Sequence, residues 1–143
     1  MEPTNEIAKN QKNTLHLAQE LLRLMGSGAE ASGIARLCSE NLDWEIAGDN
    51  GALPWIGKKS GRTALVDFIN GLRSMTEPIA FEVHDILTGD KRAIILGSLA
   101  TKLKRTGKAV KTDFAIVLTA ANGEIIRFQM LEDSFAVSKW ARG

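Results

Sequence analysis

Tyrosine is absent from this chain of 143 residues, which also contains only one cysteine, two histidines and three prolines. The missing tyrosine removes the phenol hydroxyl from the possible catalytic groups. The single cysteine, Cys38, excludes an internal disulfide and is typical of the reducing cytosol, so we expect a cytoplasmic protein. The histidines, His16 and His84, lie far apart without acidic neighbours at ligand spacing, which disfavours a metal site.

Long apolar runs are lacking as well. The polar first 13 residues contain no signal-peptide core, and no later run has the length of a membrane span. A formal net charge of +1 gives no overall attraction to nucleic acid or to anionic membranes. One basic cluster has no interleaved aromatic side chains and is explained as a solvated strand edge guarded by lysine. Its members are Lys102, Lys104, Arg105, Lys108 and Lys111. We therefore expect neither a nucleic-acid partner nor a membrane partner.

What the chain does contain is typical of a soluble globular domain. Hydrophobic residues make up 44% and charged residues 24% of the sequence. No internal repeat, low-complexity linker or break in composition divides the chain. The length suffices for one core, so we expect a single domain over residues 1–143.

Helical periodicity dominates the first half. Apolar residues recur at helical spacing over 5–25 and more briefly over 29–38. Alternation over 42–47 predicts a short strand, and a loop rich in glycine and proline follows. Ser60 is a candidate N-cap for a third helix, whose buried stripe runs from Leu65 to Leu72.

Beyond Pro78 the period changes from helical to strand-like. We expect four strands, over 79–87, 92–104, 108–120 and 124–132, joined by short turns. A last short helix, capped by Asp133 or Ser134, would reach Trp140. Helices first and an antiparallel meander second predict an α+β protein, without a wholly parallel sheet.

The turns predict the register of the last strands. Asn122-Gly123 is a strong signal for a two-residue hairpin, and Thr106-Gly107 is treated in the same way. Uninterrupted pairing then places Asp113 opposite Glu132, and by the same count Val117 opposite Phe128 and Ala115 opposite Met130. Both faces of the resulting sheet are substantially apolar. Since an apolar face must be covered, we expect helices on one side and a second subunit on the other, in a homodimer.

Three segments resemble one known family. Gly57–Arg62 resembles its loop with two spaced glycines, Val110–Phe114 the start of its penultimate strand, and Leu131–Ser134 the acidic end of its last strand. With the order of the elements, they make the chain similar to the SnoaL-like, ketosteroid isomerase-like branch of the nuclear-transport-factor-two-like superfamily. The resemblance implies a cone-shaped, cystatin-like α+β roll. In such a roll, three N-terminal helices pack on a curved antiparallel or mixed sheet that encloses one pocket.

The resemblance also implies which face lines the pocket. In ketosteroid isomerases an acid on the penultimate strand helps to bind the oxyanion, and its place matches Asp113. The expected lining residues are therefore Ser98, Asp113, Val117, Phe128, Met130 and Glu132, with Trp44 and Trp55 at the cone mouth. Trp44 also fits the core. Trp55, after Pro54 in a loop, is either a wall that stacks on a ligand or a lid over the core.

Two carboxylates opposite each other are the most chemical feature of this arrangement. If Asp113 and Glu132 were partly buried, their repulsion would keep a proton on one of them near neutral pH, as a general acid or base requires. The alternative is a solvated rim, where the two acids pair with Lys102 or Lys111. Asp113 and Glu132 are the candidate catalytic residues.

Departures from the pattern of the family narrow the range of activities that we expect. The isomerase oxyanion hole uses tyrosine, and the epoxide hydrolases of this fold need Arg and Asp on the third strand, where this chain has Ser98 and Ala100. Both activities are disfavoured. We expect a small, apolar or amphipathic ligand and acid–base chemistry of the isomerase, cyclase or dehydratase type, without metal or cofactor. The alternative is a module of the same fold that binds a ligand or a protein partner without catalysis.

Overall fold

Six strands form one mixed sheet in the order β2-β1-β6-β5-β4-β3 in the computed structural model, which describes residues 3–143. The strands are β1 (Cys38–Ile46), β2 (Gly57–Ser60), β3 (Thr76–Thr88), β4 (Arg92–Leu103), β5 (Ala109–Ala121) and β6 (Glu124–Glu132). Strand β1 runs parallel to β6, and all other neighbours are antiparallel. The sheet stays open, with β2 and β3 at its edges.

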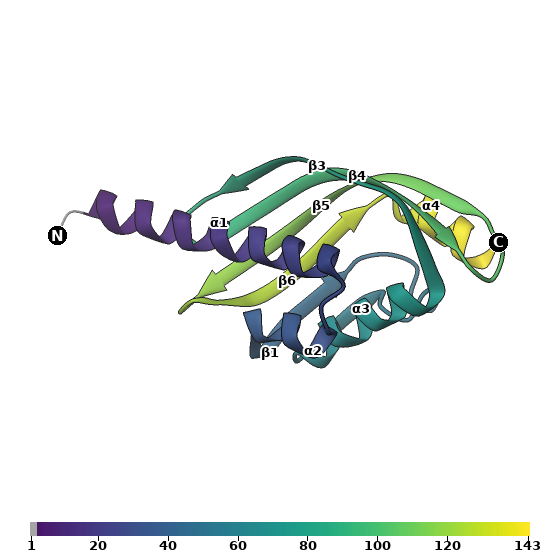
Figure 1. Ribbon diagram of the computed structural model, residues 1–143, viewed down its shortest axis with the longest axis horizontal. Coiled ribbons are helices and arrows are strands. Elements are labelled where there is room, and N and C mark those ends of the chain that lie inside the picture. Colours follow the sequence, from purple (N-terminus) through teal and green to yellow (C-terminus); the bar gives the residue numbers. More distant parts are fainter. Residues whose placement is uncertain (1–2) are drawn as a thin grey trace.

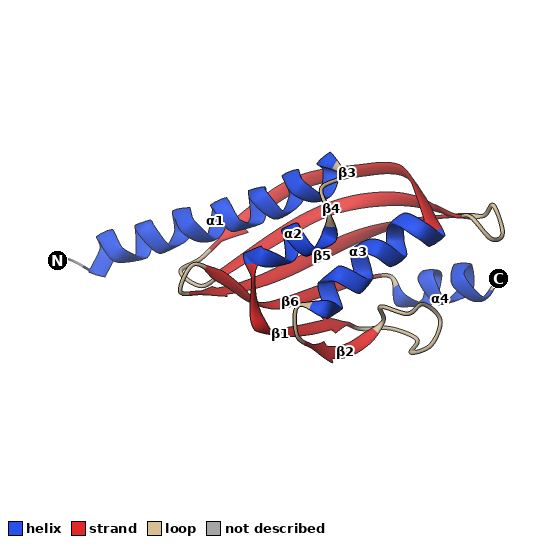
Figure 2. Cartoon of the chain, turned by 60° about the horizontal axis from the view of Figure 1, so that its bottom comes forward, coloured by secondary structure: helices blue, strands red, loops and turns tan. Residues whose placement is uncertain are grey.

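The helices lie over one face of this sheet (Figures 1 and 2). They are α1 (Pro3–Ser27), α2 (Ala31–Ile34), a 3₁₀ turn (Ala35–Leu37), α3 (Thr63–Met75) and α4 (Ser134–Arg142). Helix α1 runs along β3 and β4, whereas α4 follows β6 at the end of the sheet. No helix within residues 3–143 is both long and apolar enough to cross a membrane. The predicted α+β cone is confirmed.

Aromatic side chains hold the helix layer against the sheet. Trp44 of β1 is fully buried and stacks on Phe128 of β6, with ring centroids 4.4 Å apart. Phe68 of α3 packs on the same indole at 5.1 Å. The indole N–H of Trp44 donates to the Trp55 carbonyl oxygen over 3.2 Å, which ties the loop between β1 and β2 to the core. This aromatic part of the core therefore lies between α3 and the β1–β6 half of the sheet, and the rest of the core continues under α1 and across β4 and β5.

Several element boundaries differ from the predictions. Strand β1 begins at Cys38, within the range predicted as the second helix. Ser60 ends the short strand β2, and the N-cap of α3 is Arg62, which makes no side-chain cap. Strand β3 includes Pro78 because an edge strand does not need every N–H for pairing. The predicted cap of α4 is confirmed, since Asp133 accepts a hydrogen bond from the Ala136 N–H over 3.0 Å.

The register between β5 and β6 differs from the prediction beyond the Asn122-Gly123 turn. Ala121 pairs with Glu124 as expected, but Ala120 pairs with Ile125 and Thr119 with Arg127. Ile126 is thus an extra residue without a partner, in other words a β-bulge. One inserted residue moves every later side chain of β6 to the other face, relative to β5.

The register between β4 and β5 also differs, but without that consequence. The loop is four residues long, because the Leu103 N–H donates to the Lys108 carbonyl oxygen over 2.8 Å. Ala100 therefore lies opposite Lys111, where the expected two-residue turn at Thr106-Gly107 would have placed Lys102. A shift by an even number of residues leaves each side chain on its predicted face of the β4–β5 pair.

Candidate functional site

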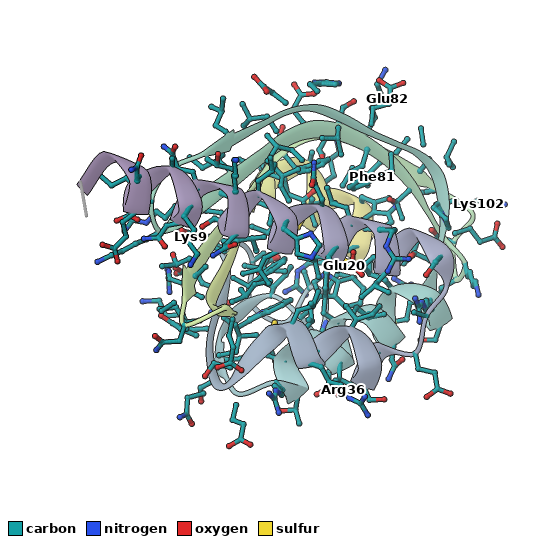
Figure 3. The ribbon with its side chains drawn as sticks, turned by 60° about the vertical axis from the view of Figure 1, so that its left-hand side comes forward. Lys9, Glu20, Arg36, Phe81, Glu82 and Lys102 are labelled. Carbon is teal, nitrogen blue, oxygen red and sulfur yellow. The ribbon has the colours of Figure 1, made fainter. Side chains whose placement is uncertain are left out.

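A cavity of about 500 Å³ lies between the helices and the inner face of the sheet, the face toward α1 and α3. Helices α1 and α3 and the loop before β2 form one side of it, and strands β3 to β6 with α4 form the other. Figure 3 shows the two sides of β3 near this space, with Phe81 pointing inward toward α1 and Glu82 pointing away. Phe81 lines the cavity and stacks on Phe114 with centroids 5.1 Å apart.

Glu132 is the only acidic residue among the described residues that line the cavity. It is half-buried at the end of β6, where its Oε2 accepts a hydrogen bond of 2.9 Å from the hydroxyl of the buried Thr112. Burial raises the pKa of Glu132 above its ordinary value, and the charge of Asp133 adds to the increase, while the Thr112 hydroxyl offsets part of it. Oε1 has no hydrogen-bond partner within the described residues.

Asp113 does not meet Glu132, and the predicted pair is wrong. Strand β6 places Glu132 opposite Phe114, because the bulge at Ile126 shifts the register by one. Asp113 is exposed on the outer face, the face away from the helices, and lies opposite Ser98. The rim alternative fails as well, since neither Lys102 nor Lys111 forms an ion pair with either acid within residues 3–143.

Ser98 and Val117 share that outer face and do not line the cavity. Their placement on the pocket face was wrong. The structure also shows where His84 lies: its Nε2 is 3.3 Å from the Ser98 hydroxyl and 3.6 Å from a Glu82 carboxylate oxygen. Ser98 and Glu82 both lie next to the same ring nitrogen of His84, on an open surface of the sheet. In a catalytic triad the serine and the acid contact different ring nitrogens, so this is not a triad.

The other predicted ligand-binding residues divide between cavity and core. Trp55, Phe128 and Met130 line the cavity, as expected. Trp44 does not line it, because Phe128 and Phe68 cover its indole on the cavity side of the core. Trp55 is 6% exposed and contacts Phe68 edge-on at 5.7 Å, so it is a fixed wall as well as part of the core.

A glycine in α3 makes room for the Trp55 wall. A β-carbon at Gly71 would lie 2.9 Å and 3.0 Å from two ring carbons of Trp55. Real β-carbons do not approach other atoms so closely, so any larger residue at 71 would push the indole aside. The position of Trp55 therefore depends on the absence of a side chain at residue 71.

Helix α4 closes one end of the cavity with Val137 and Trp140. The indole N–H of Trp140 donates to the Lys108 carbonyl oxygen over 2.8 Å. Arg142 donates to both carboxylate oxygens of Asp49, over 2.6 Å and 3.1 Å, which ties α4 to the loop before Trp55. Arg142, together with the Ser138 hydroxyl, lowers the pKa of Asp49 to about 2. The turn residue Asp49 thus clamps two walls of the cavity together.

Sequence reasoning missed Arg73, Trp140 and Thr112. Arg73, in the last turn of α3, lines the cavity, and its Nη1 donates to the Ala29 carbonyl oxygen over 2.6 Å. A usable signal existed for Thr112. Its side of β5 carries Val110, Phe114, Ile116 and Leu118, whereas the other side carries Lys111 and Asp113. The more apolar side of a strand is the better candidate for the inner face.

One further reactive group, the thiol of Cys38, lies outside the cavity. Cys38 is buried, and burial raises the pKa of its thiol to about 11, so the thiol stays protonated near neutral pH. Within residues 3–143, no three His, Cys, Asp or Glu side chains come together in a way that could hold a metal ion.

A family model and the solved structures show what the chain is similar to. The model of the SnoaL-like domain matches residues 18–128, and no curated protein matches the chain in sequence. An NTF2-like protein from Burkholderia xenovorans is 18% identical, with a TM-score of 0.81 over 92% of this chain and 97% of that chain. At this level of identity, structural similarity shows the fold alone.

Two further structures have the same fold. One is from Mesorhizobium loti and is named for a SnoaL-like polyketide cyclase; it is 17% identical, with a TM-score of 0.67 over 82% of this chain and 97% of that chain. The other, TerC, was co-crystallised with polyporic acid. It is 14% identical, with a TM-score of 0.77 over 92% of this chain and 99% of that chain.

Proposed function

Because the chain belongs to the SnoaL-like domain family, we propose that it binds a small, largely apolar molecule in the cavity and uses Glu132 for acid–base chemistry on it. One observation carries the proposal: a single half-buried carboxyl group with a raised pKa lines an otherwise largely apolar cavity. The reaction class is isomerisation, cyclisation or dehydration. A proton removed from carbon and returned elsewhere needs one group that can hold it, and Oε1 of Glu132 is free for this task.

The neighbours support this class of ligand. The names of two of them refer to polyketide cyclase and to polyporic acid, which are both connected with ring-containing organic molecules. Trp55, Phe68 and Phe128 would supply aromatic walls for such a molecule. Thr112 would hold Glu132 in place, since its hydroxyl donates to Oε2 and leaves Oε1 without a hydrogen-bond partner within residues 3–143.

Proton exchange next to a carbonyl group tests the proposal without knowledge of the natural substrate. We expect the protein to accelerate deuterium incorporation at the α-carbon of 2-tetralone in D₂O, followed by NMR. Glu132→Gln should reduce this acceleration by about 10²-fold or more, the usual contribution of a general acid or base. Asp113→Asn is the matched control: it removes a carboxylate from the outer face and should leave the exchange unchanged.

Three outcomes separate the alternatives. Acceleration that survives Glu132→Gln would contradict the role of Glu132. Binding of 2-tetralone without any acceleration would favour the alternative function, a module that binds without catalysis. Absence of binding by several aromatic ketones would contradict the proposed use of the cavity.

We also propose that a second copy covers the outer face of the sheet. Leu87 and Leu131 are exposed there, at 50% and 43%, beside the half-buried Ile94, Leu96 and Val117. Covering these side chains would remove apolar surface from water. Light scattering should give the mass of a dimer at micromolar concentration, and Val117→Glu should shift it to a monomer with an unchanged circular dichroism spectrum. A clean wild-type monomer would contradict the dimer.

A further inference from the structure

The cavity carries one positive group, and it lies on the opposite wall from the acid. Of the described residues that line the cavity, only Arg73 is a cation and only Glu132 is an acid. Arg73 projects from the helix wall and is exposed to solvent, whereas Glu132 projects from the sheet wall. The two charges do not pair with each other, so the cavity has two chemically different polar points.

The guanidinium of Arg73 is held in place and still has free donors. Its Nη1 donates to the Ala29 carbonyl oxygen over 2.6 Å, which anchors the side chain between α3 and the segment before α2. No carboxylate lies within ion-pair distance of Arg73 in residues 3–143. A guanidinium has five N–H donors, so one bond to a backbone oxygen leaves most of them available.

The surroundings of Arg73 add positive charge. The Lys104 ammonium donates to the backbone oxygen of Arg73 over 3.2 Å, so a second cation lies beside the end of α3. On the neighbouring strand β3, Glu77 is 3.9 Å from the Lys102 ammonium and is therefore already paired. The exposed Glu30 follows Ala29, the backbone partner of Arg73, and forms no ion pair with Arg73. Two cations, Arg73 and Lys104, thus lie together at the end of α3, although the chain as a whole is nearly neutral.

We infer that the ligand of this cavity is an amphipathic organic anion, with its carboxylate on Arg73 and its apolar body against the aromatic walls. This inference rests on the proposed function and names the class of ligand. A carboxylate suits the rim because a guanidinium binds it through two parallel hydrogen bonds, and that end stays in contact with water. The same ligand places its uncharged part toward Glu132, where a second carboxylate would be repelled and desolvated.

A pair of probes that differ only in charge tests the inference. We compare 1-pyrenebutyrate with 1-pyrenebutanol by fluorescence anisotropy at pH 7 and low salt. The wild-type protein should bind the butyrate about tenfold more tightly than the alcohol, a modest value because the rim is solvated. Added salt should reduce the difference.

Variants test whether Arg73 causes the difference in affinity between the two probes. Arg73→Met should make the two affinities equal, and Arg73→Lys should keep part of the preference. Lys59→Met is the matched control, since it removes an exposed cation of β2 that does not line the cavity, and it should keep the full preference. Damage to the α1–α2 segment from loss of the Ala29 bond would weaken both probes alike and would leave their ratio unchanged.

The outcomes are distinct. Equal wild-type affinity for both probes, or a preference that survives Arg73→Met, overturns the inference and leaves the proposed function intact. Failure of both probes to bind overturns the inference together with the proposed use of the cavity.

Discussion

The inner and outer faces of the sheet differ in how strongly packing restricts the side chains that they carry. On the inner face of β5, every residue from Val110 to Leu118 is buried, whereas Lys111 and Asp113 on the outer face are exposed. The helices cover only one face, so each inner side chain has a fixed volume to fill, while the outer ones face water in the monomer. A substitution of the same chemical kind should therefore have very different effects on the two faces.

The largest effect is expected for an aromatic residue on the inner face. Phe128→Ala should lower the free energy of unfolding by about 3–5 kcal/mol, because it removes the ring that stacks on Trp44 and leaves a hole in the core. Leu131→Ala, three residues later on the outer face, should cost less than about 1 kcal/mol. Urea unfolding at one protein concentration measures both. Similar losses for the two variants would contradict the contrast between the faces.

A glycine on the inner face should give the next largest effect. A β-carbon at Gly97 would lie 2.1 Å from the Glu82 carbonyl oxygen and 2.6 Å from a ring carbon of Phe114. The backbone oxygen cannot move without disturbing the pairing of β3 with β4, so Gly97→Ala should cost about 3 kcal/mol. Gly89→Ala is the control: its nearest atom is 4.0 Å away, and it should be nearly neutral. A Gly97→Ala protein as stable as the wild type would show that the strands separate easily there.

The two carboxylates give a smaller difference that depends on pH. Because the pKa of Glu132 is raised in the folded protein, the native state binds its proton more tightly than the unfolded state. Its contribution to stability therefore falls as pH rises from the ordinary pKa of a glutamate, 4.5, through the raised pKa of the folded protein. Glu132→Gln removes this decline, so its stability relative to wild type should be higher at pH 8 than at pH 4.

Asp113→Asn provides the comparison on the outer face. It should change the free energy of unfolding by less than about 0.5 kcal/mol, as expected for a substitution at an exposed position. Urea titrations at several pH values decide the matter. A larger pH-dependent effect from Asp113→Asn than from Glu132→Gln would reverse the assignment of the buried acid.

A small effect is also expected for the ion pairs on the outer face. Arg127 donates to Asp43 over 2.5 Å and to Glu45 over 2.9 Å, and so connects β6 with the parallel strand β1. Arg127→Met should cost no more than about 1 kcal/mol at low salt, because exposed ion pairs are screened by water and ions. Thermal unfolding at low and high salt measures it. A cost above that of Gly97→Ala would mean that these pairs are shielded from solvent.

Sequence periodicity was enough to predict the layers of this fold but not its register. The helical stripe of α1, the strand alternation beyond Pro78 and the cap at Asp133 are local signals, and each one is confirmed. The bulge at Ile126 has no comparable local signal, because it depends on how β6 fits between β5 and β1. One unpaired residue was therefore sufficient to make the predicted Asp113–Glu132 pair wrong.

The prediction of the candidate site was only partly right, because the register shift in β6 separates its residues onto two faces. Phe128, Met130 and Glu132 lie on one strand, so they reach the cavity together, whereas Asp113, Ser98 and Val117 reach the other face together. The family resemblance favoured the wrong face of β5, although the apolar alternation of Val110, Phe114 and Ile116 favoured the right one. Arg73 and Trp140 come from helix ends, and only the tertiary structure brings such positions together.

Gly71 has a consequence for how such a protein could change its ligand during evolution. Residue 71 stands behind the Trp55 wall, so replacing its hydrogen by a methyl group would move the indole and alter the capacity of the cavity from outside it. Selection could thus adjust the size of the accepted molecule with one nucleotide change and leave Glu132 and Arg73 in place. Under the proposed function, chemistry and ligand size would be encoded at separate positions, so that each could diverge independently.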